Sequence, residues 1–382
     1  MDASVNRIPS SADERSILIA VRLPGQDQVS VEYSLGELKM LVTTAGAVVI
    51  DSLIVKRERI DPTFIIGRGY INSIASMIAE KGLRLVVFDL NNIRPAQIRN
   101  IEQALKCRVV GRTEIILEIF ARRARSSEAK IQVELAQLRY ILPRLKGLGG
   151  VLSRLGGGIG TRGPGEKMLE TDRRHILRRI SILRERLEKV SSHRSLVRKS
   201  RSHEVRGAIV GYTNAGKSTL LNLLAHDDLF VEDRLFATLD AYTRSVHLAG
   251  GKKVLLTDTV GFINNLPANL IESFKSTLEE IRNAHFLIHV IDATAVDLEH
   301  NISTVQRELQ SLGCAQKPII QFFNKIDLCV NVDMISVISL RFPEAISGSA
   351  LRGTGMESLK ERLLSLHDAL SSHSRSGFSA VP

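Results

Sequence analysis

The chain has 382 residues, of which 44% are apolar, and its formal net charge is +11. This length and apolar content indicate a globular protein of two or three domains, each with a core of its own. The three cysteines (Cys107, Cys314 and Cys329) are too few and too scattered for a disulfide framework or a Cys-x-x-Cys zinc site, and no apolar run is long enough to span a membrane.

The first part of the chain alternates between short strands and helices. After a polar segment at residues 1–15, which we expect to be disordered, strands are expected at 16–22, 47–54 and 84–88 and helices at 34–44, 70–80 and 95–104. Ser34 and Glu37 form a capping-box pattern that opens the first helix. Because alternating strands and helices favour parallel pairing, residues 16–112 are predicted to form a small α/β domain.

The next part is predicted to be a long antiparallel helical hairpin over residues 113–198. Its two apolar seams, with alternating steps of four and three, are Ile131, Leu135, Leu138, Leu142 and Leu145, and then Ile176, Ile180, Leu183, Leu187 and Val190. Pro143 lies inside the first seam, so that helix should kink or stop just before it. A Gly-rich loop is expected at 146–168, and the polar, basic segment 191–204 is interpreted as a hinge.

The positive charge is concentrated in this helical part. Residues 112–206 contain 23 Lys and Arg against 10 Asp and Glu, so their excess of 13 positive charges is larger than that of the whole chain. Arg154 and Arg162 lie in the Gly-rich loop, where residues 146–167 include nine glycines. A flexible connector and a solvated helical face are the alternative interpretations. A concentrated excess of one sign favours a polyanionic partner, in particular RNA.

A second α/β domain is predicted over residues 203–370, before a Ser-rich tail at 371–382 that we expect to be disordered. It opens with a strand and then the pattern G-x-x-x-x-G-K-[ST]. The loop consists of Gly211, Tyr212, Thr213, Asn214, Ala215, Gly216, Lys217 and Ser218, and Thr219 follows in a helix. In this setting backbone N–H groups converge on phosphate oxygens, Lys217 reaches the β- and γ-phosphates, and Ser218 can ligate Mg²⁺. A chance match to a strand-to-helix turn is the alternative.

Three later motifs, each after a predicted strand, support a nucleotide site and select the base. The first is Asp258, Thr259, Val260 and Gly261, in which Asp258 holds Mg²⁺ and the Gly261 N–H faces the γ-phosphate. The second, Asn324–Asp327, offers the Asp327 carboxylate to two guanine N–H groups, while Lys325 lies along the base. The third, Ser349, Ala350 and Leu351, offers a backbone N–H to the guanine oxygen. The order of the motifs predicts GTP as the ligand.

Two positions decide how this site performs hydrolysis. Thr238, in the segment Phe236, Ala237, Thr238, Leu239 and Asp240, is expected to complete the Mg²⁺ shell with Ser218 and Asp258, and Thr243 is the alternative. Lys217, Thr238 and Gly261 are the predicted catalytic residues. After Asp-x-x-Gly, Ras-like enzymes carry a glutamine that orients water, whereas this chain has Phe262. A slow basal rate is therefore expected.

These residues resemble those of the HflX family, ribosome-binding GTPases of the Obg-HflX group. The resemblance rests on GGGIGTRGPGEKMLETDR (156–173), GYTNAGKS (211–218), FATLD (236–240) and DTVGF (258–262), and upstream on RPAQIRNIE (94–102) and IQVELAQL (131–138). Met168 and Gly111 depart from the residues that are usual in the family, glutamine and aspartate. The resemblance implies that Phe262 is a family trait.

The resemblance also implies a fold, a partner and a role. The fold is α/β: a P-loop GTPase domain with a mostly parallel sheet and helices on both faces, preceded by the small α/β domain and the helical hairpin. The partner is the large ribosomal subunit, contacted through Arg154, Arg162 and the hairpin, and the role is the splitting of stalled ribosomes. We expect a monomer in the cytoplasm, associated with ribosomes or the membrane periphery. Alternatives are a GTPase of ribosome assembly or RNA modification, and a non-hydrolysing, GTP-sensing RNA-binding scaffold.

Overall fold

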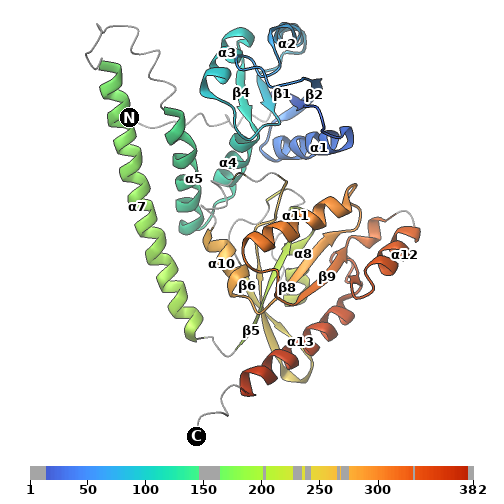
Figure 1. Cartoon of the computed structure of the whole chain (residues 1–382). Helices are drawn as coiled ribbons and strands as arrows, with labels where there is room; N and C mark the ends of the chain where they lie inside the picture. Colours follow the sequence, from blue (N-terminus) through green and yellow to red (C-terminus); the bar gives the residue numbers. More distant parts are fainter. Residues whose placement is uncertain are drawn as a thin grey trace. The chain divides into compact units, whose positions relative to one another are not determined.

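The computed structural model describes residues 14–145, 164–200, 204–226, 235–236, 242–264, 267, 275–329 and 332–376. The chain divides into two compact units, one of residues 1–189 with 267–273 and the other of residues 190–266 with 274–382 (Figure 1). Several predictions made from the sequence lie outside the described residues: the N-terminal segment up to residue 13, Arg154, Arg162, Ala237 and Thr238.

The first unit contains a four-stranded parallel sheet in the order β2-β1-β3-β4. The strands are β1 (Arg15–Arg22), β2 (Val48–Lys56), β3 (Leu85–Phe88) and β4 (Arg108–Gly111), and the helices between them are α1 (Gln28–Thr44), α2 (Arg68–Lys81) and α3 (Pro95–Leu105). Side chains of β1 and β3, among them Ile17, Ile19 and Phe88, are fully buried in the core. The predicted parallel α/β fold is confirmed, although β4 was missed, because only two of its four residues, Val109 and Val110, are apolar.

The predicted start of the first helix is wrong. Helix α1 begins at Gln28, because the Asp27 side chain accepts the Ser30 N–H at 3.1 Å and so caps it. The Ser34 hydroxyl instead donates to Asp89 Oδ2 at 2.5 Å. Glu37, the other half of the expected capping box, is buried and forms an ion pair with Arg112. A buried guanidinium requires carboxylate partners, and that requirement overrides the local pattern.

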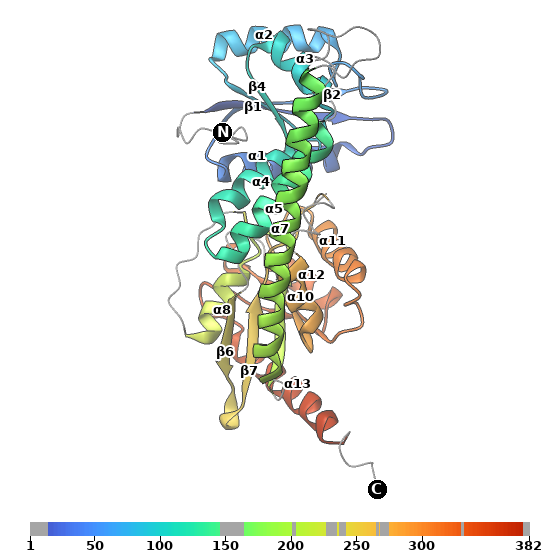
Figure 2. The ribbon, with the colours of Figure 1, turned by 90° about the vertical axis from the view of Figure 1, so that its left-hand side faces the viewer.

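Three helices, α4 (Arg112–Arg123), α5 (Ser127–Leu145) and α7 (Pro164–Ser200), follow the sheet. Figures 1 and 2 show α5 and α7 side by side and antiparallel, and their seam buries Leu135, Ile180 and Leu183. The partly buried members of the seam are Ile131, Leu138, Leu142, Ile176 and Leu187. The Arg179 guanidinium contacts Glu134 across the seam, with Nε 2.6 Å from Oε1. The predicted packing of the two apolar seams is confirmed.

The ends of these helices differ from the prediction. Helix α5 continues past Pro143 to Leu145, because a proline in the last turn removes only one hydrogen bond near the helix end. Helix α7 begins at Pro164, inside the predicted loop, since proline is favoured at the first helical position. It continues to Ser200, so the predicted hinge at 191–204 is mostly helical.

The second unit contains a six-stranded sheet in the order β10-β9-β8-β5-β7-β6, in which only β6 is antiparallel to its neighbour. Its strands are β5 (Val205–Gly211), β6 (Tyr242–His247), β7 (Lys253–Asp258), β8 (Phe286–Asp292), β9 (Ile319–Asn324) and β10 (Ile346–Ser347). Figure 2 shows β6 and β7 as a projecting hairpin, closed by the short helix η2 (Ala249–Gly251). The predicted mostly parallel sheet is confirmed.

Helices cover both faces of this sheet. They are α8 (Lys217–Ala225), α10 (Lys275–Asn283), α11 (Leu298–Ser311), α12 (Val332–Arg341) and α13 (Met356–Ser376), with the short helix η3 (Ile326–Leu328) after β9. Leu220 of α8 and Leu359 of α13 share a core with Ile288 of β8, whereas Ile302 of α11 packs with Ile338 of α12 and Ile291 of β8. Helix α13 extends to Ser376, beyond the predicted start of the tail. The carboxyl ends of the parallel strands β5, β7 and β9 lie on the same side of the sheet. Open α/β sheets bind their ligands at this side.

Candidate nucleotide-binding site

The loop between β5 and α8 takes its shape from two close approaches of backbone. A Cβ atom on Gly211 would lie 2.2 Å from the Val290 carbonyl oxygen of β8. A Cβ on Gly216 would lie 2.2 Å from the Asn324 amide nitrogen, and Gly216 has a φ of 92°. Asn214 also adopts a left-handed conformation, with a φ of 62°. Only glycine fits at positions 211 and 216. The loop can therefore make a tight turn before α8 begins at Lys217.

Lys217 is a buried cation. Its side chain is 6% exposed, and its Nζ donates to the Tyr212 carbonyl oxygen at 2.8 Å. Burial lowers the pKa of this ammonium to about 8, although the nearby Asp258 carboxylate opposes the shift. A cation held at such a cost in solvation is suited to a strongly anionic ligand.

Ser218 and Asp258 come together from α8 and the end of β7. The Ser218 hydroxyl donates to Asp258 Oδ2 at 2.6 Å, and Asp258 is 2% exposed. The next residue, Thr259, is held by a hydrogen bond of 2.7 Å from its hydroxyl to the Ile209 carbonyl oxygen of β5. A hydroxyl and a carboxylate placed together are the oxygen donors that Mg²⁺ prefers, so these two predicted ligands fit the ion. The third predicted ligand, Thr238, lies outside the described residues.

Asn324 joins the phosphate loop to the last predicted motif. Its Nδ2 donates to the Ala215 carbonyl oxygen at 2.8 Å, and its Oδ1 accepts the Ala350 N–H at 2.8 Å. The side chain is only 3% exposed. These two bonds connect segments that lie 109 and 26 residues away in sequence. Asn324 therefore sets the spacing between the loop and the Ser349–Leu351 segment.

The neighbours of Asn324 leave one carboxylate open to solvent. Lys325, with a φ of 65°, forms an ion pair with Asp292 Oδ2 at 2.8 Å. Asp327 is exposed in η3. Ser349 turns its hydroxyl to the Arg352 N–H at 3.1 Å, while Leu351 is 74% exposed. An exposed carboxylate beside an ordered turn can accept two ligand N–H groups.

The two segments predicted to face the γ-phosphate both touch Thr213. Phe236 donates its N–H to the Thr213 hydroxyl at 3.1 Å, and the Thr213 N–H donates to the Phe262 carbonyl oxygen at 2.7 Å. Gly261 is so close to the loop that a Cβ there would lie 2.7 Å from Lys217 Nζ. Val260 and Phe262 are 8% and 4% exposed.

Some functional arrangements were not evident from the sequence. Thr243, the alternative to Thr238, lies in β6 with its hydroxyl 2.9 Å from that of Thr257. The sequence did not predict a role for Asp292, which forms the ion pair with Lys325. Many strands end in an acidic residue, so this pattern does not identify such a position. The Tyr212 hydroxyl accepts the Asn264 N–H at 2.8 Å. Thr219 is half-buried in α8.

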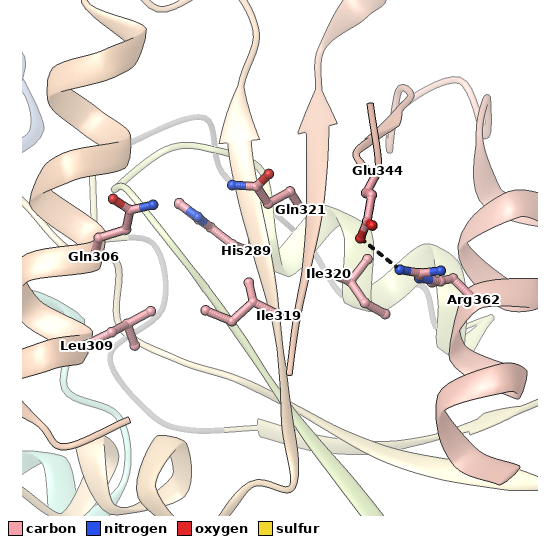
Figure 3. A pocket seen from close by; sticks show the side chains of 8 residues that line it. All are labelled: His289, Gln306, Leu309, Ile319, Ile320, Gln321, Glu344 and Arg362. Atoms are coloured by element: carbon pink, nitrogen blue, oxygen red, sulfur yellow. Dashed lines mark hydrogen bonds and ion pairs between the residues drawn. The ribbon is translucent and has the colours of Figure 1, made fainter. Parts of the chain in front are cut away.

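A further cavity of about 140 Å³ is lined by residues outside these loops. Figure 3 shows Gln306 and Leu309 of α11 on one side of it and the ion pair between Glu344 and Arg362 on the other. His289 also lines it, and burial lowers the pKa of this imidazole to about 4. None of its lining residues belongs to the predicted nucleotide motifs.

Among the residues that the structure describes, no three His, Cys, Asp or Glu side chains gather in a way that could hold a metal ion. His285 accepts the Arg206 backbone N–H at its Nδ1, at 3.1 Å. No helix among the described segments has the length and apolar character needed to cross a membrane.

Family models and known relatives match most of the chain. Family models described as "GTP-binding GTPase N-terminal", "GTP-binding GTPase Middle Region" and "50S ribosome-binding GTPase" match residues 32–121, 123–201 and 206–325. A GTPase HflX from Caldanaerobacter subterraneus subsp. tengcongensis is 51% identical over 317 residues, which cover 82% of this chain and 73% of that protein. A GTPase HflX from Escherichia coli is 39% identical over 355 residues, with 92% and 82% covered. The solved structure of SsGBP with GDP has 26% identity and a TM-score of 0.50, and the match covers 94% of this chain and 99% of that one.

Proposed function

Since this chain belongs to the HflX family and is a GTPase, which converts GTP to GDP and phosphate, we propose that it uses the state of its nucleotide to control binding to the large ribosomal subunit. The proposal includes a role in splitting stalled ribosomes. It assigns the nucleotide to the loops at the ends of β5, β7 and β9. The observation that carries the site is the set of hydrogen bonds by which Asp258 and Asn324 join the other loops to the phosphate-binding loop.

Each loop has one task in the proposed site. The N–H groups between Asn214 and Ser218 surround the phosphates, and Lys217 neutralises their charge. Asp327 accepts the two N–H groups of guanine, and the Ala350 segment, fixed by Asn324, approaches the guanine oxygen. Adenine lacks this donor pair and would place an acceptor against the Asp327 carboxylate. The site is therefore selective for GTP.

Hydrolysis requires charge stabilisation and a placed water. Ser218 and Asp258, with Thr238 as the third ligand, would hold Mg²⁺, which supplies charge neutralisation at the β- and γ-phosphates. The Lys217 ammonium lies within the phosphate-binding loop, where it donates to the Tyr212 carbonyl oxygen. The Gly261 N–H stabilises the γ-phosphate. Phe262 has no hydrogen-bonding side chain and its ring is buried, so it cannot orient the attacking water. We therefore propose slow basal turnover that a partner accelerates.

The proposed partner contact lies on the basic hairpin. Arg178, Arg184 and Arg186 of α7 are exposed, whereas Ile180 and Leu183 between them face α5. Packing within the hairpin therefore leaves these three guanidinium groups exposed to solvent. We assign ribosomal RNA as the polyanion that binds these arginines, because the nucleotide-binding domain matches a family model of ribosome-binding GTPases. Arg154 and Arg162 of the Gly-rich loop are assigned to the same contact.

The test is GTP turnover by the purified protein, alone and with large ribosomal subunits, at two salt concentrations. We expect a slow basal rate, strong stimulation by the subunits, and weaker stimulation at high salt. The double variant Arg178→Ala/Arg184→Ala should need more subunits for half-maximal stimulation, whereas Arg307→Ala, at an exposed position of α11, should not. A fast basal rate without stimulation would contradict the proposal.

The remaining alternative is a GTPase of ribosome assembly or RNA modification, which would share the same nucleotide chemistry. Stimulation by precursor particles in preference to mature subunits would favour it. The non-hydrolysing scaffold is disfavoured because the chain belongs to a family of GTPases.

A further inference from the structure

We propose that Asp292 is a positioning residue for guanine nucleotides, which holds the Lys325 side chain along the base through an ion pair. The inference rests on the proposed assignment of Lys325 to the base plane. It goes beyond that assignment because Asp292 ends β8, outside every predicted nucleotide motif, and has no contact of its own with the nucleotide in the proposed site.

The pairing of β8 with β9 fixes where this carboxylate lies. Asp292 is the last residue of β8, and its partner in the parallel register is Asn324, the last residue of β9. The Ala293 N–H donates to the Asn324 carbonyl oxygen at 2.9 Å, which continues the pairing one residue past the strand. Backbone hydrogen bonds therefore place Asp292 directly beside the predicted base-binding motif.

Both carboxylate oxygens of Asp292 have partners that orient them. Its Oδ1 accepts the Thr294 N–H at 2.9 Å and the Thr294 hydroxyl at 2.6 Å. An aspartate that accepts the N–H two residues further on forms a local turn, which limits the rotation of its side chain. The remaining oxygen, Oδ2, lies 2.8 Å from the Lys325 Nζ. The carboxylate is thus held with one oxygen toward the Lys325 ammonium.

The ion pair orders a side chain that is otherwise flexible. The Lys325 backbone is already constrained, because its φ of 65° is left-handed and its carbonyl oxygen accepts the Leu328 N–H at 3.0 Å. Its side chain has four rotatable bonds, and fixing them against a ligand costs conformational entropy. Because Asp292 fixes the far end of this side chain before the nucleotide binds, less entropy is lost on binding.

The consequence concerns the strength of binding more than the choice of base. In the proposed site the Lys325 stem lies along the face of the base, which is alike in guanine and hypoxanthine. The Asp327 carboxylate accepts from the edge, where only guanine has a 2-amino group. Loss of the Asp292 carboxylate should therefore weaken GDP and inosine diphosphate by the same factor. Both side chains of the ion pair are 22% exposed, so we expect this factor to be modest.

The experiment is a double-mutant cycle, read by titration of the full chain with a fluorescent GDP analogue. Asp292→Asn keeps an acceptor for Thr294 but loses the charge, and Lys325→Ala removes the partner. We expect Asp292→Asn to raise the dissociation constant for GDP about fivefold, which is about 1 kcal/mol, and Lys325→Ala to raise it at least as much. In the Lys325→Ala background, Asp292→Asn should add less than twofold, because the carboxylate acts through the ammonium.

Two further measurements accompany the cycle. Asp297→Asn is the matched control, because it removes a negative charge five residues further on while asparagine can still accept the His300 N–H that caps α11. It should change the dissociation constant for GDP less than twofold. Competition with inosine diphosphate should show the same factor of loss in Asp292→Asn as GDP does.

The outcomes separate this inference from the proposed function. Unchanged GDP affinity in Asp292→Asn would overturn it, as would a loss in the double variant equal to the product of the two single losses. Wild-type affinity in Lys325→Ala would remove Lys325 from the base and the inference with it, whereas GTP turnover and its stimulation by large ribosomal subunits test the proposed function independently. If Asp292→Asn does not fold, Asp292→Ala takes its place with the same expected result, since Thr294 is exposed and water can replace its lost bonds.

Discussion

Replacement of Asn324 tests whether one amide holds the phosphate loop and the guanine loop in register. In Asn324→Ala, the Ala215 carbonyl oxygen and the Ala350 N–H both lose a partner at 2.8 Å, at a position that is 3% exposed. A buried polar group left without a partner costs about 1–3 kcal/mol, so the two together cost about 2–6 kcal/mol. Part of this cost lowers the free energy of unfolding of the free protein. The rest weakens nucleotide binding, because the two loops that hold the nucleotide are no longer fixed in place.

We therefore expect the dissociation constant for GDP to rise at least about tenfold, which is about 1.4 kcal/mol. The urea-unfolding free energy should fall by about 1–3 kcal/mol. Titration with a fluorescent GDP analogue measures the first quantity. Asn283→Ala, at an exposed position at the end of α10, is the matched control and should change neither.

The variant Asn324→Asp tests the two hydrogen bonds separately, because it removes the one to Ala215 and keeps the one to Ala350. The carboxylate can still accept the Ala350 N–H, but it presents an acceptor to the Ala215 carbonyl oxygen. It should lose at least as much affinity as Asn324→Ala. Wild-type affinity in both variants would refute the idea that this side chain sets the spacing of the site.

Three further predictions concern specificity, pH and stability. Asp327→Asn should weaken GTP and favour xanthosine triphosphate, as competition binding can show, and an unchanged preference for guanine would refute the assigned base contact. Because burial lowers the pKa of Lys217 to about 8, GTP affinity should be nearly constant below pH 7, fall about twofold by pH 8 and then fall by up to about tenfold per pH unit as the free ammonium loses its proton. A dissociation constant that stays flat to pH 9.5 would contradict this. Arg112→Met leaves Glu37 and Asp89 as buried carboxylates without their cation and should lower the unfolding free energy by about 3–5 kcal/mol in urea titrations at pH 7; a loss below 1 kcal/mol would show that the cluster is dispensable.

Short-range patterns determined much about this protein. The alternation of strands and helices predicted both parallel sheets, and the two heptad seams predicted the packing of α5 on α7, because each signal depends on residues within a few turns of one another. The loop before α8 was recognisable for the same reason, since its glycines, Lys217 and Ser218 are contiguous. Family membership, which the motifs indicated, was confirmed by the relatives.

Tertiary structure decided what depends on distant partners. Ser34 and Glu37 have a good capping pattern, yet the buried Arg112, more than 70 residues later, places Glu37 in an ion pair and the Ser34 hydroxyl beside Asp89. Asn324 was predicted as part of a base-binding motif, but its bonds to Ala215 and Ala350 follow from the pairing of β5, β8 and β9. The double contact of Thr213 with Phe236 and Phe262 arises in the same way. Local propensity is worth tenths of a kcal/mol per residue, whereas an unpaired buried charge or amide costs several, so the long-range partner decides wherever the two conflict.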